Sequence, residues 1–333
     1  MIPNQWYPVY ESRRLRKRSV ALQRLGERLV LWRNDVGRAV GMRDRCPHRG
    51  VALSLGRVRA GRIECPFHGF QFDASGRCQL MPCEGPDARI PAGMEVPTYE
   101  IREAHGLVWL FWGKAREALP EIPWFDELVD RPGGGSIAKE WPINYARTIE
   151  SNFDLHHTPF VHGRWTPGIG TRIDRYHVEV DGLHIKTRGE LRKENASKGI
   201  PFRVEFLPPC ITLLEITPKL RFVLADCPID AHRTWRCGRY YQDFLRWPRL
   251  QNAASWLFLQ LDWALFQLPQ DLRVMETQDP QQPADHVDRL VAADGGTAAY
   301  QKQRRRLLAE AETAREKAGE SRAAPLREVS AGP

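Results

Sequence analysis

The chain has 333 residues, of which 42% are hydrophobic, and its 49 basic and 41 acidic side chains leave a net charge of +8. This length and apolar content predict two domains of ordinary size, each with a buried core. The basic residues are scattered among acidic ones, which disfavours nucleic-acid binding and favours a surface that attracts an acidic protein partner.

The cysteines and the apolar segments indicate where the protein works. Seven cysteines at irregular spacings lack the paired pattern of a disulfide framework. Arg13-Arg14 is followed by more charged residues instead of an uninterrupted apolar region, which excludes a twin-arginine export signal. The longest apolar stretch, Leu250 to Leu261, is about half of the ~20 residues that span a membrane. We therefore expect reduced thiols, no membrane span and a cytoplasmic location.

The first third of the chain predicts a small antiparallel β domain. Val20 to Leu22 and Arg28 to Trp32 read as strands on either side of Gly26, and residues 34–37 form the next turn. Residues 104–112 look like the last strand of this unit. We assign residues 1–115 to this first domain.

Two loops of this domain each carry a cysteine and a histidine. The first reads Cys46-Pro47-His48, and the second, sixteen residues later, reads Cys65-Pro66-Phe67-His68. Two thiolates on one iron and two imidazoles on the other are the ligands of a Rieske [2Fe–2S] cluster. Zinc also binds two cysteines and two histidines, but zinc fingers pair like with like, whereas each pair here is mixed. We predict that Cys46, His48, Cys65 and His68 bind a Rieske cluster.

Residues 113–132, rich in proline and charge, predict the connection to a second domain, which we place at residues 116–299. Gly133-Gly134-Gly135 predicts a flexible loop. Further on, Asp181-Gly182 is a strong tight-turn dipeptide between two segments with strand patterns. Three more segments predict strands, so this domain should contain an antiparallel sheet with helices packed on it: Ile211 to Ile216, Leu220 to Leu224 and Thr234 to Tyr241.

The stretch Asn152 to His162 contains a second candidate metal site, with the spacing D-x2-H-x4-H. Asp154 and His157 are three residues apart and would share one face of a helix. Pro159 should kink or end that helix and swing His162 back toward His157. Two imidazoles suit iron and lack only a carboxylate to complete a 2-His-1-carboxylate site. The alternative is a buried helix with hydrogen-bonded histidines.

Two later segments predict helices. Ala254 to Leu268 is apolar nearly all round, and we expect most of it to be a core helix under the sheet. The alternative is that Phe258, Leu261 and Leu265 line a substrate pocket. Residues 300–333 are charged and alanine-rich, which is typical of a solvated helix and a frayed tail.

Taken together, the two motifs resemble those of the catalytic (alpha) subunit of Rieske non-haem iron oxygenases, in the monooxygenase and demethylase branch. The resemblance follows the order of domains from Trp6 to about Gln278. It implies an α+β fold, in which an amino-terminal antiparallel β Rieske domain precedes a helix-grip (START-like) catalytic domain with an antiparallel sheet and helices.

In that family a later helix supplies the third ligand of the mononuclear iron. Gln270-Asp271-x2-Val274 resembles that segment, so Asp271 is our choice, and Asp262 is the alternative because it interrupts an apolar helix. By resemblance, Asp154 bridges His157 to His68 of a neighbouring subunit. Family members often place an asparagine three or four residues before the bridging aspartate, where this chain has Ser151 and Glu150.

The resemblance implies an oxidoreductase that hydroxylates an aromatic or polycyclic small molecule, using O2, a [2Fe–2S] cluster and mononuclear Fe(II). Oxidative O- or N-demethylation and cis-dihydroxylation are alternatives, and a Rieske electron-transfer protein without oxygenase activity is a different class. No dinucleotide fingerprint follows a strand, so a separate NAD(P)H-dependent reductase or ferredoxin would supply the electrons. The resemblance also implies a homotrimer.

Overall fold

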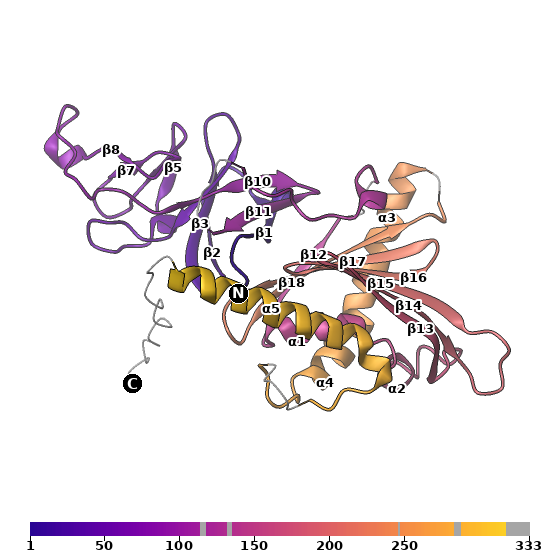
Figure 1. Cartoon of the computed structure of the whole chain (residues 1–333). Helices are drawn as coiled ribbons and strands as arrows, with labels where there is room; N and C mark the ends of the chain where they lie inside the picture. The colour runs from indigo at the N-terminus through magenta and orange to yellow at the C-terminus, as the bar shows by residue number, and fades with distance from the viewer. Residues whose placement is uncertain (114–117, 132–134, 246, 283–287, 318–333) are drawn as a thin grey trace.

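The structure is a computed structural model that describes residues 1–113, 118–131, 135–245, 247–282 and 288–317. A body of short β-strands lies beside a larger body with one wide sheet, and helix α5 (Gly295–Lys317) runs beneath both (Figure 1). The expected flexible residues 133 and 134 and the expected tail from residue 318 onward lie outside the described residues.

The amino-terminal body contains three small antiparallel sheets. One has the order β1-β11-β10, a second β2-β3-β4-β9, and a third β5-β6-β7-β8. The predicted strands around Gly26 are confirmed, but residues 104–112 are not one strand, because a turn at His105 and Gly106 separates β10 from β11. The strands are β1 (Gln5–Glu11), β2 (Val20–Arg24), β3 (Glu27–Arg33), β4 (Ala39–Arg43), β5 (Arg57–Arg59), β6 (Arg62–Glu64), β7 (Gln71–Phe72), β8 (Cys78–Leu80), β9 (Thr98–Tyr99), β10 (Ile101–Ala104) and β11 (Leu107–Trp112).

The second body is built on a seven-stranded antiparallel sheet of order β12-β18-β17-β16-β15-β14-β13. The tight turn at Asp181-Gly182 joins β13 to β14, and Gly182 has a φ of +58°, as its place in the turn requires. β15 is a strand that the sequence patterns did not reveal. The strands are β12 (Ile137–Trp141), β13 (Arg172–Asp181), β14 (His184–Arg192), β15 (Ile200–Leu207), β16 (Ile211–Thr217), β17 (Leu220–Pro228) and β18 (Thr234–Gln242).

Helices cover this sheet and connect its ends. Helix α1 (Tyr145–Phe153) contacts β16 and β17, and α5 packs on α1, β13 and β14. The prediction of a wholly solvated helix from residue 300 was wrong, since Tyr300 is buried against Phe153 and Phe206. The other helices are α2 (Thr158–Val161), α3 (Pro248–Asp262), a π-helix (Trp263–Leu272) and α4 (Arg273–Met275).

Helix α3 corrects a second expectation. It packs on β18, but Phe258 and Leu261 are exposed, and neither they nor Leu265 line the large cavity of this domain. The pocket interpretation of these three side chains was therefore wrong, and the core interpretation was wrong for Phe258 and Leu261, whereas Leu265 is half-buried and Leu259 and Trp263 of the same segment are buried in a core cluster. The exposed side of a helix can be predicted from sequence when polar residues lie along it. This segment has few polar residues, so its exposed side could not be predicted.

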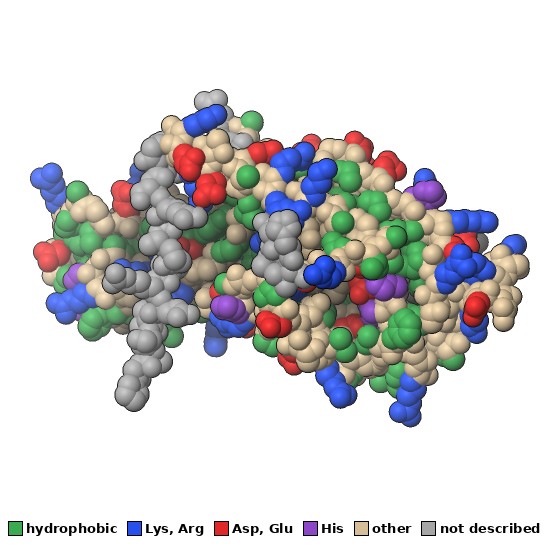
Figure 2. Space-filling model, turned by 60° about the horizontal axis from the view of Figure 1, so that its bottom comes forward, with side chains coloured by type: hydrophobic (Ala, Val, Ile, Leu, Met, Phe, Trp, Pro, Cys, Tyr) green, Lys and Arg blue, Asp and Glu red, His purple; other side chains and the backbone are tan. Residues whose placement is uncertain are grey.

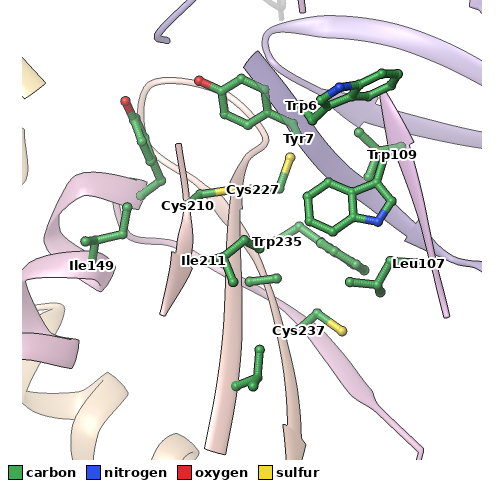
Figure 3. Close-up of a cluster of buried hydrophobic side chains, with 14 of the residues drawn as sticks. Trp6, Tyr7, Leu107, Trp109, Ile149, Cys210, Ile211, Cys227, Trp235 and Cys237 are labelled. Atoms are coloured by element: carbon green, nitrogen blue, oxygen red, sulfur yellow. The ribbon is translucent and has the colours of Figure 1, made fainter. Parts of the chain in front are cut away.

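The two bodies share one hydrophobic core. Trp6, Tyr7 and Trp109 of the amino-terminal body lie against Cys210, Cys227 and Trp235 of the wide sheet (Figure 3). Backbone N–H groups of Leu25 and Gly26 donate to the carbonyls of Pro228 and Ile229, at 2.7 and 2.8 Å. This buried contact fixes the orientation of the two bodies.

The predicted fold class is confirmed: an antiparallel β domain precedes a sheet-rich domain with a few helices. Among the described residues, no helix is both long enough and apolar enough to cross a bilayer.

Candidate metal centres

The two Cys/His loops of the amino-terminal body fold into the same turn. In each, the cysteine N–H donates to the carbonyl five residues later, and a glycine N–H donates back to the cysteine carbonyl, at 2.8 to 3.0 Å. These glycines are Gly50 and Gly69, with φ of +75° and +74°, a conformation that favours residues without a Cβ. One loop follows β4 and the other follows β6, which lie in different sheets. A buried cluster that includes Cys46, Leu53, Cys65 and Phe70 packs the two turns together.

The four predicted ligands come together in two pairs. Cys46 and Cys65 are buried, and burial raises the pKa of the Cys46 thiol to about 11. The Nδ1 atoms of His48 and His68 are 3.2 Å apart, nearer the surface. Two buried thiols with two imidazoles nearer the surface fit a Rieske cluster, which needs two sulfur ligands on one iron and two nitrogen ligands on the other.

The second candidate site lies in the sheet-rich body. Ligand atoms of His157, His162 and Asp271 all lie within 4.8 Å of one another. Oδ1 of Asp271 is 3.0 Å from Nε2 of His162 and 3.6 Å from Nε2 of His157. Two imidazoles and one carboxylate match the donor set of non-haem Fe(II) sites.

The local path of the chain differs from the expected bent helix. Helix α1 ends at Phe153, and Asp154 is its extended C-cap, so Asp154 and His157 do not share a helical face. Instead, the backbone N–H of His157 donates to Oδ1 of Asp154 at 3.1 Å. Pro159 lies in the first turn of α2, where a missing N–H has no cost, so it begins a helix instead of interrupting one.

Both histidines are oriented from behind. Nδ1 of His162 is 3.0 Å from Oε1 of Gln270, and Nδ1 of His157 is 3.6 Å from Oδ1 of Asp154. These contacts turn both Nε2 atoms toward Asp271, as metal ligation requires. Gln270 was missed by the sequence reasoning, although its place beside the chosen ligand could have suggested it.

The π-helix explains how Asp271 reaches the histidines. In an α-helix, residues nine apart are rotated by about 180°, so Asp262 and Asp271 would point to opposite sides. The wider winding of Trp263–Leu272 brings both carboxylates to the same cavity, together with Phe266 and Gln267. Wide turns of this kind are frequent at functional sites.

The candidate iron ligands lie in the wall of a cavity of about 690 Å³. Most of its lining is apolar, including Trp141, Phe202 and Phe266. In Figure 2, histidine and acidic side chains lie together on the sheet-rich body, and hydrophobic side chains surround them. Asp262, the alternative ligand, also lines this cavity but is not among the three grouped ligand residues. Burial and the charge of Asp271 raise the pKa of Asp262 to about 7.

A buried polar network supports the end of α1 from the sheet. Arg236 donates to Oδ1 of Asp226 at 2.8 Å and to Oδ1 of Asn152 at 2.7 Å. Asn152 in turn donates to Oδ2 of Asp226 at 2.9 Å. All three side chains are buried, and Asn152 is two residues before Asp154. The network therefore fixes where the turn that carries His157 begins.

Comparison with known proteins identifies the first body. The family model of the Rieske [2Fe-2S] domain matches residues 5–100. The amino-terminal body is a Rieske domain. Its match includes both Cys/His loops and ends before β10.

The relatives extend beyond the Rieske domain. The chain is 32% identical to protein TIC 55, chloroplastic, of Pisum sativum over 62% of its length, and 29% identical to methylxanthine N1-demethylase NdmA of Pseudomonas putida over 91%. The matches cover 38% of the first relative and 88% of the second. Across the first three relatives the chain spans less than two-fifths of their length.

Solved structures show the same fold. NdmA with caffeine superposes with a TM-score of 0.73 at 25% identity, covering 93% of this chain and 92% of the other. Dicamba monooxygenase bound to dicamba gives a TM-score of 0.76 at 20% identity, covering 95% and 99%. The matched Rieske domain implies a Rieske cluster, and relatives such as the 3-chlorobenzoate-3,4-dioxygenase oxygenase subunit of Comamonas testosteroni imply a mononuclear iron and O2 as co-substrate.

Proposed function

We propose that this protein is the catalytic subunit of a Rieske oxygenase and that it hydroxylates an aromatic or polycyclic small molecule. The observation that carries the proposal is the meeting of His157, His162 and Asp271 in the wall of a mostly apolar cavity, on a chain that also has a Rieske domain. An electron-transfer protein of the Rieske class has no use for this second ligand set. The relatives named as oxygenases support the same assignment.

Two separate sets of residues would bind the two metal centres. Cys46, His48, Cys65 and His68 would hold the cluster, and His157, His162 and Asp271 would hold the iron. A ferrous ion bound there would supply dioxygen activation, and the cluster would supply electrons. Leu155, Phe266 and the other apolar side chains exclude water from the cavity and hold the substrate ring beside the ligands.

Asp154 is the proposed link between the two centres. Its Oδ1 is 3.1 Å from Nδ1 of His156 and 3.6 Å from Nδ1 of His157, and about a third of its side chain is exposed. We propose a homotrimer in which the exposed side of Asp154 faces His68 of a neighbouring subunit. His68 is half-buried beside the exposed Phe67, so the edge of the cluster site can reach another protein. The electrons come from a separate reductase or ferredoxin, and the cytoplasmic location stays a prediction.

Oxidative N-demethylation is the second candidate reaction. It is favoured by the relative named methylxanthine N1-demethylase, which matches 91% of this chain. Hydroxylation of an aliphatic carbon and N-demethylation both begin at a C–H bond, and hydroxylation of an arene begins at the ring, so the same cavity and ligand set would serve any of these reactions.

The test is a single-turnover experiment with ¹⁸O2. The full chain is loaded anaerobically with Fe(II), its cluster is reduced with dithionite, and aromatic and N-methylated compounds are added. We expect ¹⁸O in a hydroxylated product, or formaldehyde in the case of demethylation. Asp271→Ala should lose the mononuclear iron and all product yet keep the visible spectrum of the cluster. The control Asp181→Ala, at an exposed turn, should behave like the wild type.

Two results would contradict the proposal. A colourless zinc protein would remove the cluster. If Asp262→Ala loses iron and product while Asp271→Ala keeps both, the third ligand has been assigned to the wrong aspartate.

The trimer is tested by mixing two inactive variants, one lacking His68 and the other lacking Asp271. If electrons cross between subunits, mixed trimers contain an intact cluster beside an intact iron site, and activity returns. If every mixture stays inactive, electron transfer within one chain is the correct description and Asp154 loses its bridging role.

A further inference from the structure

The catalytic cavity is acidic, although the whole chain is basic. Only three of the residues that line it are arginines, while seven are carboxylates. A bound ferrous ion would offset two of those negative charges. The chain outside the cavity carries the excess of positive charge that makes the total +8. The carboxylates are Glu150, Asp154, Glu215, Asp262, Asp271, Asp288 and Asp294.

Two of the three arginines are already paired. Arg236 is bonded to Asp226 and Asn152, and Arg147 bridges Glu150 and Asp288 at 2.8 and 2.6 Å. The third, Arg289, is exposed. An anionic substrate group inside the cavity would therefore meet carboxylates, and none of the described lining residues offers it a free buried guanidinium.

Asp262 is the carboxylate with unused bonding capacity. Its Oδ2 is buried and accepts no hydrogen bond from the residues that the structure describes. The hydroxyl of Tyr240 lies near the Asp262 carboxyl group and lowers its pKa, the one effect of a neutral donor on that group among the described residues. When ionised, the carboxylate can accept about four hydrogen bonds, so one donor leaves most of that capacity unused. A buried acceptor without a partner destabilises the structure, and a ligand that donates to it removes that penalty.

Gln267 adds a second unsatisfied acceptor to the same wall. Its side chain is 8% exposed, and its Oε1 also has no partner among the described residues. Asp262 and Gln267 are five residues apart, and the π-helix places both on the side that faces the cavity. Apolar side chains surround these two acceptors. This wall therefore fits an apolar ring that carries a hydrogen-bond donor at one edge.

Resting on the oxygenase assignment above, we propose that Asp262 determines substrate class. The cavity selects an apolar ring compound that carries an amine or another N–H donor, held by the Asp262 carboxylate, and it rejects carboxylates and sulfonates of the same ring. Asp262 binds substrate and is not an iron ligand.

The first test needs no variant. Anaerobic titration calorimetry compares three ligands with one ring, 1-naphthylmethylamine, 1-naphthylmethanol and 1-naphthoate, on the full chain with its cluster and Fe(II) in place. Because a hydrogen bond to a charged group contributes about 1.5–3 kcal/mol, the amine should bind about 10- to 100-fold more tightly than the naphthoate, with the alcohol between them. Equal or tighter binding of naphthoate would overturn the proposal.

The second test uses Asp262→Asn, which keeps the shape of the side chain and removes its charge. We expect the preference for the amine to fall to within about threefold, with the content of mononuclear iron unchanged. Asp181→Asn makes the same change in total charge on the surface and should keep the wild-type preference. Asp262→Glu, which restores the charge, should retain at least part of the preference even if the asparagine variant folds poorly.

Each result separates this proposal from the one on which it rests. A wild-type protein that binds no mononuclear iron contradicts the oxygenase assignment. A protein that binds iron but shows no preference for the amine contradicts only the role of Asp262. Loss of iron in Asp262→Asn would make Asp262 a ligand and would also overturn the proposal.

Discussion

The buried pair Arg236–Asp226 offers the sharpest test of how the sheet supports the metal-binding turn. We predict that Arg236→Leu lowers the free energy of unfolding by about 3–5 kcal/mol, because it leaves the Asp226 carboxylate buried without its cation. Asp226 is 0% exposed, and Arg236 is 3% exposed and lies 4.7 Å over the ring of Trp141. Neither group can turn to water without opening the sheet.

The magnitude can be converted into a melting temperature. For a domain of this size, 1 kcal/mol shifts the midpoint by about 2–4 °C, so Arg236→Leu should melt about 6–20 °C below the wild type. Calorimetry measures this shift, and the visible absorption of the cluster follows the Rieske domain in the same sample. Arg306→Leu is the control, since Arg306 pairs with Glu310 on an exposed face of α5 and should cost less than about 0.5 kcal/mol.

The double variant Asp226→Leu/Arg236→Leu separates an unpaired charge from lost packing. A buried ion pair replaced by apolar groups is often neutral in stability, so the double variant should recover much of the loss. Burial raises the pKa of Asp226 and Arg236 lowers it, with a net upward shift. Without Arg236 the pKa rises further, so the destabilisation of Arg236→Leu should grow as pH rises from about 4.

Two outcomes would refute this reasoning. A loss below about 1 kcal/mol in Arg236→Leu would mean that the carboxylate finds another partner or water. A double variant as unstable as the single one would mean that packing, and not charge, holds this part of the sheet.

Three further predictions concern the metal site. Asp154→Asn should keep both metals, measured by iron analysis, but lose most turnover with the natural electron donor. Gln270→Leu should weaken Fe(II) binding about 10- to 100-fold, measured by anaerobic titration, because it frees the ring of His162. Burial lowers the pKa values of His157 and His162 and the nearby aspartates raise them, with a net upward shift from 6.5. Metal-free protein should therefore lose stability in thermal melts as pH rises above about 6.5, while Fe(II)-loaded protein should gain it, because ligation needs neutral imidazoles.

The pattern of the Rieske loops could be interpreted from sequence because all its ligands lie in two short segments. Each loop repeats one turn, with a cysteine, a histidine two or three residues later and a glycine at positive φ. Local geometry alone thus brings ligand and turn residues together. Residues 5–100 match the Rieske model that those spacings predicted.

The candidate iron site depends on contacts between residues far apart in the chain, which the spacing of a sequence motif does not show. Nothing local shows that α1 ends at Phe153, since the buried contact of Asn152 with β17 and β18 decides where the turn begins. For a related reason, the sequence alone could not decide whether Asp262 or Asp271 is the third iron ligand. The choice depends on a π-helix, and an apolar segment has the same pattern whether it winds as α or as π.

The π-helix also connects the two proposals made for this protein. By bringing Asp262 and Asp271 to one wall, it gives the cavity two carboxylates where an α-helix would present one. Asp271 lies 3.0 Å from His162, whereas Asp262 lies beside Tyr240 with a buried oxygen left unsatisfied. Under the two proposals, the same local winding places one aspartate at the metal and leaves the other for the substrate. A variant that deletes one residue from Trp263–Leu272 should restore α-helical winding and separate the two, so it should lose both iron binding and the preference for an amine.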